Sequence, residues 1–146
     1  TIPDAPKMLT EDLGKSWLSA RGVAVPDGRS VTACNVEGAA SEIGYPVALK
    51  MMSPRLAHKT EAGAVALGIN NAQALDAALG QMTTDVAEHD EAALTDGFLV
   101  EKMSPPPLAE MIVALRSDPQ FGHALVLGSG GRCCHAFAAR DPFGYC

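Results

Sequence analysis

Apolar and polar positions along the chain predict three helices. The first runs from a Thr10 cap to about Arg21, and the second runs from an Asn35 cap to Gly44, where Pro46 prevents continuation. The third opens at Asn71 and has the clearest amphipathic pattern. Its apolar residues recur at helical spacing and should cover a sheet: Leu75, Ala78, Leu79, Met82 and Val86.

Short apolar runs predict five strands, at 47–52, 64–69, 97–103, 110–116 and 124–130. The first two are close enough to pair as a hairpin, with the turn at "TEAG". The stretch 22–34 is typical of short extended pieces around a turn at Pro26-Asp27-Gly28. Because helices and strands are segregated rather than strictly alternating, we predict an α+β fold with an antiparallel sheet covered by helices.

The stretch "PVALKMMSPRLAHKTEAGAV" places charged groups around one turn. Lys50 ends a predicted buried strand, where an ammonium group is costly unless it meets an anion or reaches water. His58, Lys59 and the small pair Gly63-Ala64 follow, and small residues let backbone N–H groups approach an oxyanion closely. Two ammonium groups and a loop of backbone donors suit a polyphosphate. An exposed lysine beside an ordinary hairpin turn is the alternative, and spacing alone leaves both open.

A second charged stretch, "FLVEKMSPPPLAEMIVAL", carries Glu101, Lys102 and Glu110. A hairpin between the predicted strands 97–103 and 110–116 would bring both carboxylates towards one cleft. A solvated pair at a sheet edge is the alternative, and it is favoured when this stretch is taken alone. The glycines at 128, 130 and 131 lack the spacing of a dinucleotide fingerprint, and no Walker-type phosphate motif occurs in the chain.

Composition limits the partners of the chain. It has 146 residues and a formal net charge of -6, so its overall charge does not favour nucleic acid or an anionic membrane. Apolar runs are far shorter than the roughly 20 residues of a membrane span, and the first residues lack a signal pattern. We therefore expect a soluble, cytoplasmic protein. The four cysteines lack paired C-x-x-C spacing, so no metal site is predicted.

Four stretches follow one another in a distinctive order: "LTEDLGKSWLSARGVAVP", "ASEIGYPVALKMMSPRLAHKTEAGAVALGI", "GFLVEKM" and "EMIVALRSDPQFGHALVLGSGG". The series resembles the ATP-grasp domain of NDP-forming acyl-CoA synthetases, the family that includes ADP-forming acetyl-CoA synthetase. "SP-x-L-x-HK" before a glycine-containing turn is its most specific part. The resemblance implies an ATP-grasp fold, mainly its N-terminal nucleotide-engaging subdomain. It also implies phosphoryl transfer from ATP or another NTP, with Mg²⁺, through phosphohistidine, to activate an acyl group for transfer to or from CoA.

The resemblance also implies roles for individual residues. Lys50 is similar to the strand lysine that meets the ATP phosphates, His58 matches the histidine that receives the phosphoryl group, and Lys59 would help to hold the transferred charge. A small-residue phosphate loop corresponds to Gly63, Ala64 and Val65, with Ala64 in place of the usual second glycine. The hinge that contacts adenine through backbone groups corresponds to Glu101, Lys102 and Met103. Glu110 resembles the acidic residue on the ribose side.

The last residues depart from the family pattern. We expect a linker at 1–8, a partial ATP-grasp domain at 9–131 and an atypical, disordered tail at 132–146, with His135 where the family carries a glutamate. This end suggests a truncated domain or a frameshift, and it leaves no credible pair of Mg²⁺ ligands. The partners implied are an acyl substrate and the CoA-binding and CoA-ligase domains of the parent enzyme, so we expect no acyl-CoA turnover by this chain alone. A regulatory module of a protein acetyltransferase and an inactive fragment remain the alternatives.

Overall fold

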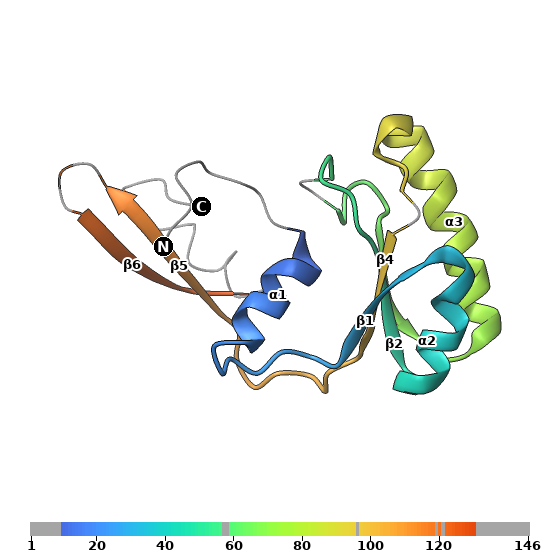
Figure 1. Cartoon of the computed structure of the whole chain (residues 1–146), viewed down its shortest axis with the longest axis horizontal. Coiled ribbons are helices and arrows are strands. Elements are labelled where there is room, and N and C mark those ends of the chain that lie inside the picture. Colours follow the sequence, from blue (N-terminus) through green and yellow to red (C-terminus); the bar gives the residue numbers. More distant parts are fainter. Residues whose placement is uncertain (1–9, 57–58, 96, 119, 121, 131–146) are drawn as a thin grey trace. The chain divides into compact units, whose positions relative to one another are not determined.

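A computed structural model describes residues 10–56, 59–95, 97–118, 120 and 122–130 (Figure 1). The chain divides into two compact units, with the boundary between Ser104 and Pro105, and each unit is described by itself. The predicted linker at 1–8 and the tail at 132–146 lie outside the described residues. Their division from the domain therefore stays a prediction.

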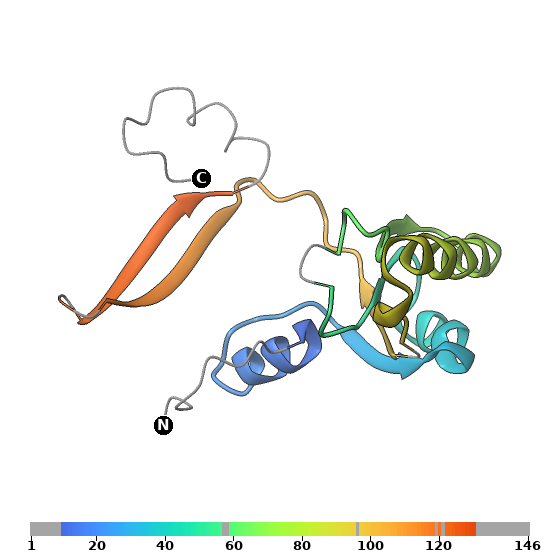
Figure 2. The same cartoon turned by 90° about the horizontal axis from the view of Figure 1, so that it is seen from above.

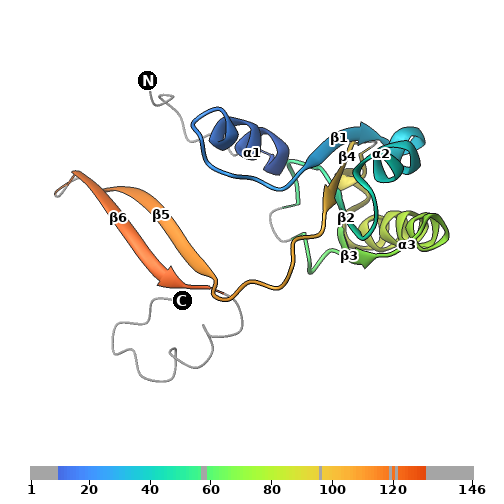
Figure 3. The same cartoon turned by 90° about the horizontal axis from the view of Figure 1, so that it is seen from below.

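The first unit contains a four-stranded antiparallel sheet in the order β1-β4-β2-β3 (Figure 3). Its strands are β1 (Gly28–Thr32), β2 (Val47–Met51), β3 (Val65–Ile69) and β4 (Gly97–Lys102). Its helices are α1 (Glu11–Ser19), α2 (Val36–Ile43) and α3 (Ala72–Asp90), with short 3-10 helices η1 (Ala33–Asn35) and η2 (Glu91–Ala93). The predicted α+β class with an antiparallel sheet is confirmed.

The position of β4 corrects one predicted pairing. β2 and β3 pair as predicted, but β4 lies between β1 and β2 and is antiparallel to both. The predicted hairpin between 97–103 and 110–116 is therefore wrong. A strand with two paired neighbours is central, so Glu101 on β4 is also not the solvated edge residue that this stretch alone favours.

Helices α2 and α3 cover the same face of the sheet (Figures 1 and 2). Successive strand residues point to opposite faces, so every second residue of β2 and β4 enters this core. The residues of β2 and β4 buried there are Val47, Leu49, Met51, Phe98 and Val100. The opposite face therefore receives the alternate residues of these strands, including Lys50 and Glu101.

Only one of the three predicted helix caps forms a side-chain cap. The Asn71 side chain accepts a hydrogen bond of 2.8 Å from the Ala74 N–H, as expected at a helix N-cap. Thr10 and Asn35 make no such bond. Asn35 ends η1 with φ −107° and ψ 0°, away from the extended backbone of a capping residue, and its amide donates to Thr32 Oγ1 instead.

The second unit contains a two-stranded antiparallel sheet of β5 (Met111–Asp118) and β6 (Gly122–Ser129). β6 begins two residues earlier than predicted, at Gly122, whose φ is +76°. Val113 lies opposite Leu127 and Leu115 lies opposite Leu125, so these four apolar side chains share one face. All of them are well exposed within the unit. An isolated two-stranded sheet gains little stability by itself.

No helix among the described parts of the chain has the length and apolar character needed to cross a membrane.

Leu49 and Leu67 offer a test of which sheet face is the core. Leu49 on β2 is fully buried, whereas Leu67 on the neighbouring strand β3 is 64% exposed. We expect Leu49→Ala to lower the free energy of unfolding by about 2–5 kcal/mol, since it removes core contacts and leaves a cavity. Leu67→Ala should change it by less than about 1 kcal/mol. Urea unfolding of the two variants measures the difference, and equal losses would contradict the assigned core.

Candidate functional site

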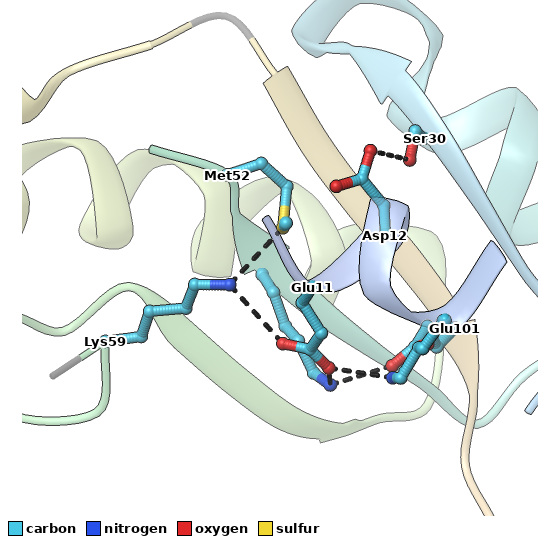
Figure 4. Close-up of polar contacts among 8 residues, drawn as sticks. Glu11, Asp12, Ser30, Met52, Lys59 and Glu101 are labelled. Carbon is cyan, nitrogen blue, oxygen red and sulfur yellow. Dashed lines mark hydrogen bonds and ion pairs between the residues drawn. The ribbon is translucent and has the colours of Figure 1, made fainter. Parts of the chain in front are cut away.

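Five charged side chains meet on the face of the sheet opposite α2 and α3. They are Lys15, Lys50, Lys59, Glu11 and Glu101, and we call them the lysine–glutamate cluster (Figure 4). They come from α1, β2, the segment after β2, and β4. Only β2 and the segment that follows it are neighbours in sequence. The tertiary fold therefore brings the cluster together.

Glu101 is the buried anion of the cluster, with a side chain only 5% exposed. Lys50 Nζ donates to Oε2 at 2.7 Å, and Lys15 Nζ donates to Oε1. The strand register explains the first contact, because Ala48 pairs with Glu101 and Lys50 pairs with Leu99. Lys50 and Glu101 are thus diagonal neighbours on one face.

Gly28 provides the space that the Glu101 side chain needs. The two residues are paired across β1 and β4. A Cβ atom at position 28 would lie 2.9 Å from Glu101 Cγ and 3.2 Å from the Val100 carbonyl oxygen. A larger residue would therefore displace the buried carboxylate from its lysine partners.

Lys50 satisfies the predicted need for an anionic partner through two carboxylates of the protein itself. Its Nζ also donates to Glu11 Oε1. Burial disfavours the Lys50 ammonium, but its hydrogen bonds to Glu101 and Glu11 outweigh this and raise the pKa of Lys50 above its ordinary value. Lys50 is therefore a permanently charged group at neutral pH.

Glu11 accepts hydrogen bonds from all three lysines of the cluster. Lys15 Nζ lies 2.7 Å from Oε1, Lys59 Nζ lies 3.4 Å from Oε2, and Lys50 also contacts Oε1. Burial acts to raise the pKa of Glu11, but the hydrogen bonds and charges of Lys15 and Lys50 outweigh it and lower that pKa to about 2. Sequence reasoning missed Glu11 and Lys15, whose four-residue spacing is equally typical of a solvated helix face.

The predicted phosphate loop is packed against α3 in this structure. The Gly63 N–H donates to the Thr60 carbonyl at 3.3 Å, and the Ala64 N–H donates to the Lys59 carbonyl at 2.8 Å. Gly63 has φ +68°, and a Cβ atom there would lie 2.6 Å from Asp85 Cβ. Ala64 is fully buried, and Val65 begins β3 opposite Lys50. These contacts give the turn a structural role, and phosphate binding by it stays a prediction.

The predicted adenine hinge follows β4. The Lys102 N–H donates to the Asp27 carbonyl, and the Met103 N–H donates to the Pro46 carbonyl. Lys102 Nζ binds the Gly44 carbonyl at 2.6 Å and the Tyr45 carbonyl at 3.2 Å. A lysine that donates to carbonyls just after a helix stabilises the helix end, so Lys102 fastens β4 to the end of α2.

Two further predicted site residues, His58 and Glu110, are not members of the cluster among the residues that the structure describes. His58 lies outside the described residues, although Lys59 beside it is in the cluster. Glu110 is exposed in the second unit, where its carbonyl accepts from the Gly130 N–H at 2.9 Å. The roles of both residues stay predictions.

An open cleft of about 530 Å³ adjoins the cluster, which is a typical volume for a small-molecule site. Lys15 and Glu101 contribute to its wall. α1, β1, β4 and the segment before β1 supply the lining: Asp12, Lys15, Ser16, Ser19, Ala20, Val25, Pro26, Gly28, Ser30, Leu99 and Glu101. Among the described residues no group of three or more His, Cys, Asp or Glu side chains is arranged to hold a metal ion.

Glu101 should contribute far more to stability than an exposed glutamate does. Glu101→Gln leaves Lys15 and Lys50 without their buried anionic partner, which typically costs about 3–5 kcal/mol. Glu42→Gln removes the same charge from an exposed pair with Arg29 and should cost less than about 1 kcal/mol. Free energies of unfolding in urea at pH 7 would test this. Similar losses in the two variants would show that Lys15 and Lys50 do not depend on Glu101 as their buried anion.

The low pKa of Glu11 predicts a pH-dependent contribution to stability. Its folded value of about 2 lies below its ordinary value of 4.5, so the contribution is complete above pH 4.5 and is lost as the pH falls towards 2. Wild type should therefore be more stable than Glu11→Gln at pH 7, and the difference should shrink at pH 3. Parallel urea titrations measure it, and a difference independent of pH would contradict the assigned cause.

Comparison with known families matches an ATP-grasp domain over residues 2–141. The beta subunit of an ADP-forming acetate–CoA ligase II from Pyrococcus furiosus is 36% identical over 124 residues, which are 84% of this chain and 52% of that subunit. A crystal structure of a Pyrococcus horikoshii protein has a TM-score of 0.82 at 35% identity and covers 88% of this chain and 55% of that one. Dinucleotide-forming acetyl-coenzyme A synthetase 1 of Ca. Korarchaeum cryptofilum, solved with coenzyme A and Ca-AMPCP, has a TM-score of 0.80 at 31% identity and covers 84% and 54%.

These matches confirm the ATP-grasp fold expected from the four ordered sequence stretches. The chain spans about half the length of the relatives named above. The match over residues 2–141 shows that the chain belongs to the ATP-grasp domain family, with ADP-forming acetate–CoA ligase among its relatives.

Proposed function

We propose that the first unit binds the phosphates of ATP or another NTP as its Mg²⁺ complex, in the nucleotide-engaging part of an NDP-forming acyl-CoA synthetase. The observation that carries this is the convergence of Lys15, Lys50 and Lys59 on one side of the sheet. Local clusters of ammonium groups are what an acidic chain needs to hold a polyphosphate. The adjoining cleft has room for a small molecule.

A relative adds support for the nucleotide and for the phosphoryl transfer. A structure of the Ca. Korarchaeum cryptofilum synthetase is described as a complex with coenzyme A and Mg-AMPPCP, with its phosphohistidine segment pointing towards the nucleotide binding site. It is 28% identical to this chain, with a TM-score of 0.64. Mg-AMPPCP and a segment described as the phosphohistidine segment therefore occur together on a protein of this fold.

In the proposed reaction His58 is the nucleophile. A neutral ring nitrogen of His58 attacks the terminal phosphorus, the bond to the bridging oxygen breaks, and the NDP leaves with that oxygen. An ordinary histidine pKa near 6.5 leaves such a nitrogen available at neutral pH. Lys50 and Lys59 neutralise the phosphoryl oxygens, since this chemistry depends mainly on positioning and charge. Mg²⁺, when bound, neutralises further phosphate charge.

The remaining residues take supporting roles in the proposal. Backbone groups of Glu101, Lys102 and Met103 contact adenine, and Glu110 lies on the ribose side. Gly63, Ala64 and Val65 approach the phosphates, which requires the turn hydrogen bonds of Gly63 and Ala64 to open. Ala64 restricts this approach more than a glycine would.

The complete ligase reaction requires an acyl substrate and CoA, which we assign to the CoA-binding and CoA-ligase domains of the parent enzyme.

Two other functions remain candidates: a regulatory module of a protein acetyltransferase, and an inactive fragment. They differ in what they predict for Lys50 and His58. A regulatory module binds nucleotide or acyl-CoA without transfer to His58, and an inactive fragment binds neither.

The proposal is tested by calorimetric titration with Mg-ATP and by radiolabelling from its terminal phosphate. Lys50→Met should weaken binding about 10–100-fold, the loss typical of one hydrogen bond to a charged group. Arg29→Met is the control, because Arg29 pairs with the exposed Glu42 on α2 and should leave affinity unchanged. Base-stable label should appear on wild type and on His89→Gln, whose histidine is exposed on α3, but not on His58→Gln.

Each outcome selects one of the three functions. Lys50-dependent binding together with His58 label supports the ligase assignment. Binding without label favours the regulatory module. Absence of Mg-ATP binding by the folded wild-type chain would overturn the proposed function. Titration with acyl-CoA would then separate a regulatory module, which binds it, from an inactive fragment, which does not.

A further inference from the structure

Glu11 occupies the centre of the three lysines to which the proposed function assigns the phosphates (Figure 4). We propose that the Glu11 carboxylate holds the place of a nucleotide phosphate group in the free protein, and that polyphosphate binding must displace it. Glu11 is then an internal competitor of the nucleotide, and Lys15 is a third phosphate-binding lysine. This inference rests on the proposed function, because it concerns the same three lysines.

The two carboxylates of the cluster differ in how firmly the fold holds them. Glu101 lies on the central strand β4 and is only 5% exposed, with Gly28 leaving the room that its side chain needs. Glu11 is 29% exposed and lies at the first position of α1. Glu101 is therefore a fixed part of the site, whereas Glu11 can reach water by a change of side-chain rotamer.

The charge of the cluster also favours replacement of the Glu11 carboxylate by a phosphate group. Three ammonium groups and two carboxylates leave the cluster with a net charge of +1, and departure of the Glu11 side chain raises that charge to +2. Carboxylate and phosphate oxygens accept the same charge-assisted hydrogen bonds from ammonium groups. The contact of Lys59 Nζ with Glu11 Oε2 is long, at 3.4 Å, and the thioether sulfur of Met52, at 3.5 Å, is a weak acceptor. A phosphate group therefore offers Lys59 a better acceptor.

The helix that carries Glu11 is lightly packed. No residue of α1 is buried, and Leu13 and Trp17 are about half exposed. Its side-chain hydrogen bonds to the sheet and to the segment after β2 are made by Glu11, Lys15 and Asp12, which accepts from Ser30. Because little apolar surface anchors α1, loss of the Glu11 contacts does not require a core to be opened. The cleft beside Lys15 and Glu101 adjoins the site that Glu11 vacates.

Glu11→Gln should bind Mg-ATP and Mg-free tripolyphosphate more tightly than wild type. If the Glu11 carboxylate leaves the three lysines free in about one protein molecule in ten, its removal raises the affinity for polyphosphate about tenfold. Glu88→Gln removes the same charge from an exposed position on α3 and should change affinity less than twofold. Glu11→Asp keeps the charge but shortens the reach to the lysines, so it should also bind more tightly than wild type.

Calorimetric titration of the folded 146-residue variants distinguishes the possibilities. Tighter binding by both Glu11 variants, but not by Glu88→Gln, supports internal competition. Equal or weaker binding by both Glu11 variants, with wild type still binding through Lys50, overturns the inference and leaves the proposed function intact. If wild type and both Glu11 variants fail to bind either polyphosphate, the proposed function fails as well. If urea titrations show that Glu11→Gln is already unfolded without urea, the affinity of Glu11→Asp alone decides the test.

Discussion

The ion pair between Lys50 and Glu101 is the interaction on which the site depends. Both groups are largely buried, and an isolated charge in that position would be strongly unfavourable. Each therefore requires the other to be held at hydrogen-bonding distance, and the register of β2 against β4 supplies this. The gap at Gly28 and the attachment of α1 through Lys15 follow from the same buried carboxylate.

A buried ion pair is a poor means of stabilising a fold, because desolvation of two charges offsets much of their attraction. It becomes useful where charge must stay available for a ligand. Here the two carboxylates bind three lysine side chains on a face that α2 and α3 leave uncovered. The same arrangement would pre-organise cations for a polyphosphate, with Glu101 as a lasting partner and Glu11 as an exchangeable one.

The sheet order explains how distant segments reach this face. β4 is the last strand of the first unit in sequence, yet it lies between β1 and β2 and brings Gly28, Lys50 and Glu101 together. The turn before β3 has a different constraint. Gly63 is needed where the turn meets Asp85 of α3, so a glycine that resembles a phosphate-loop residue also has a packing role in this chain.

The sequence by itself determined the element types, the amphipathic side of α3, the Asn71 cap and the family, since these depend on local periodicity and ordered motifs. It also indicated that Lys50 needs an anion, because a lysine at the end of an apolar run is costly. Only the tertiary structure decided which anions meet it. Strand order is set by packing between segments far apart in the chain, so the central position of β4 and the contacts of Glu11 and Lys15 could not be deduced from spacing.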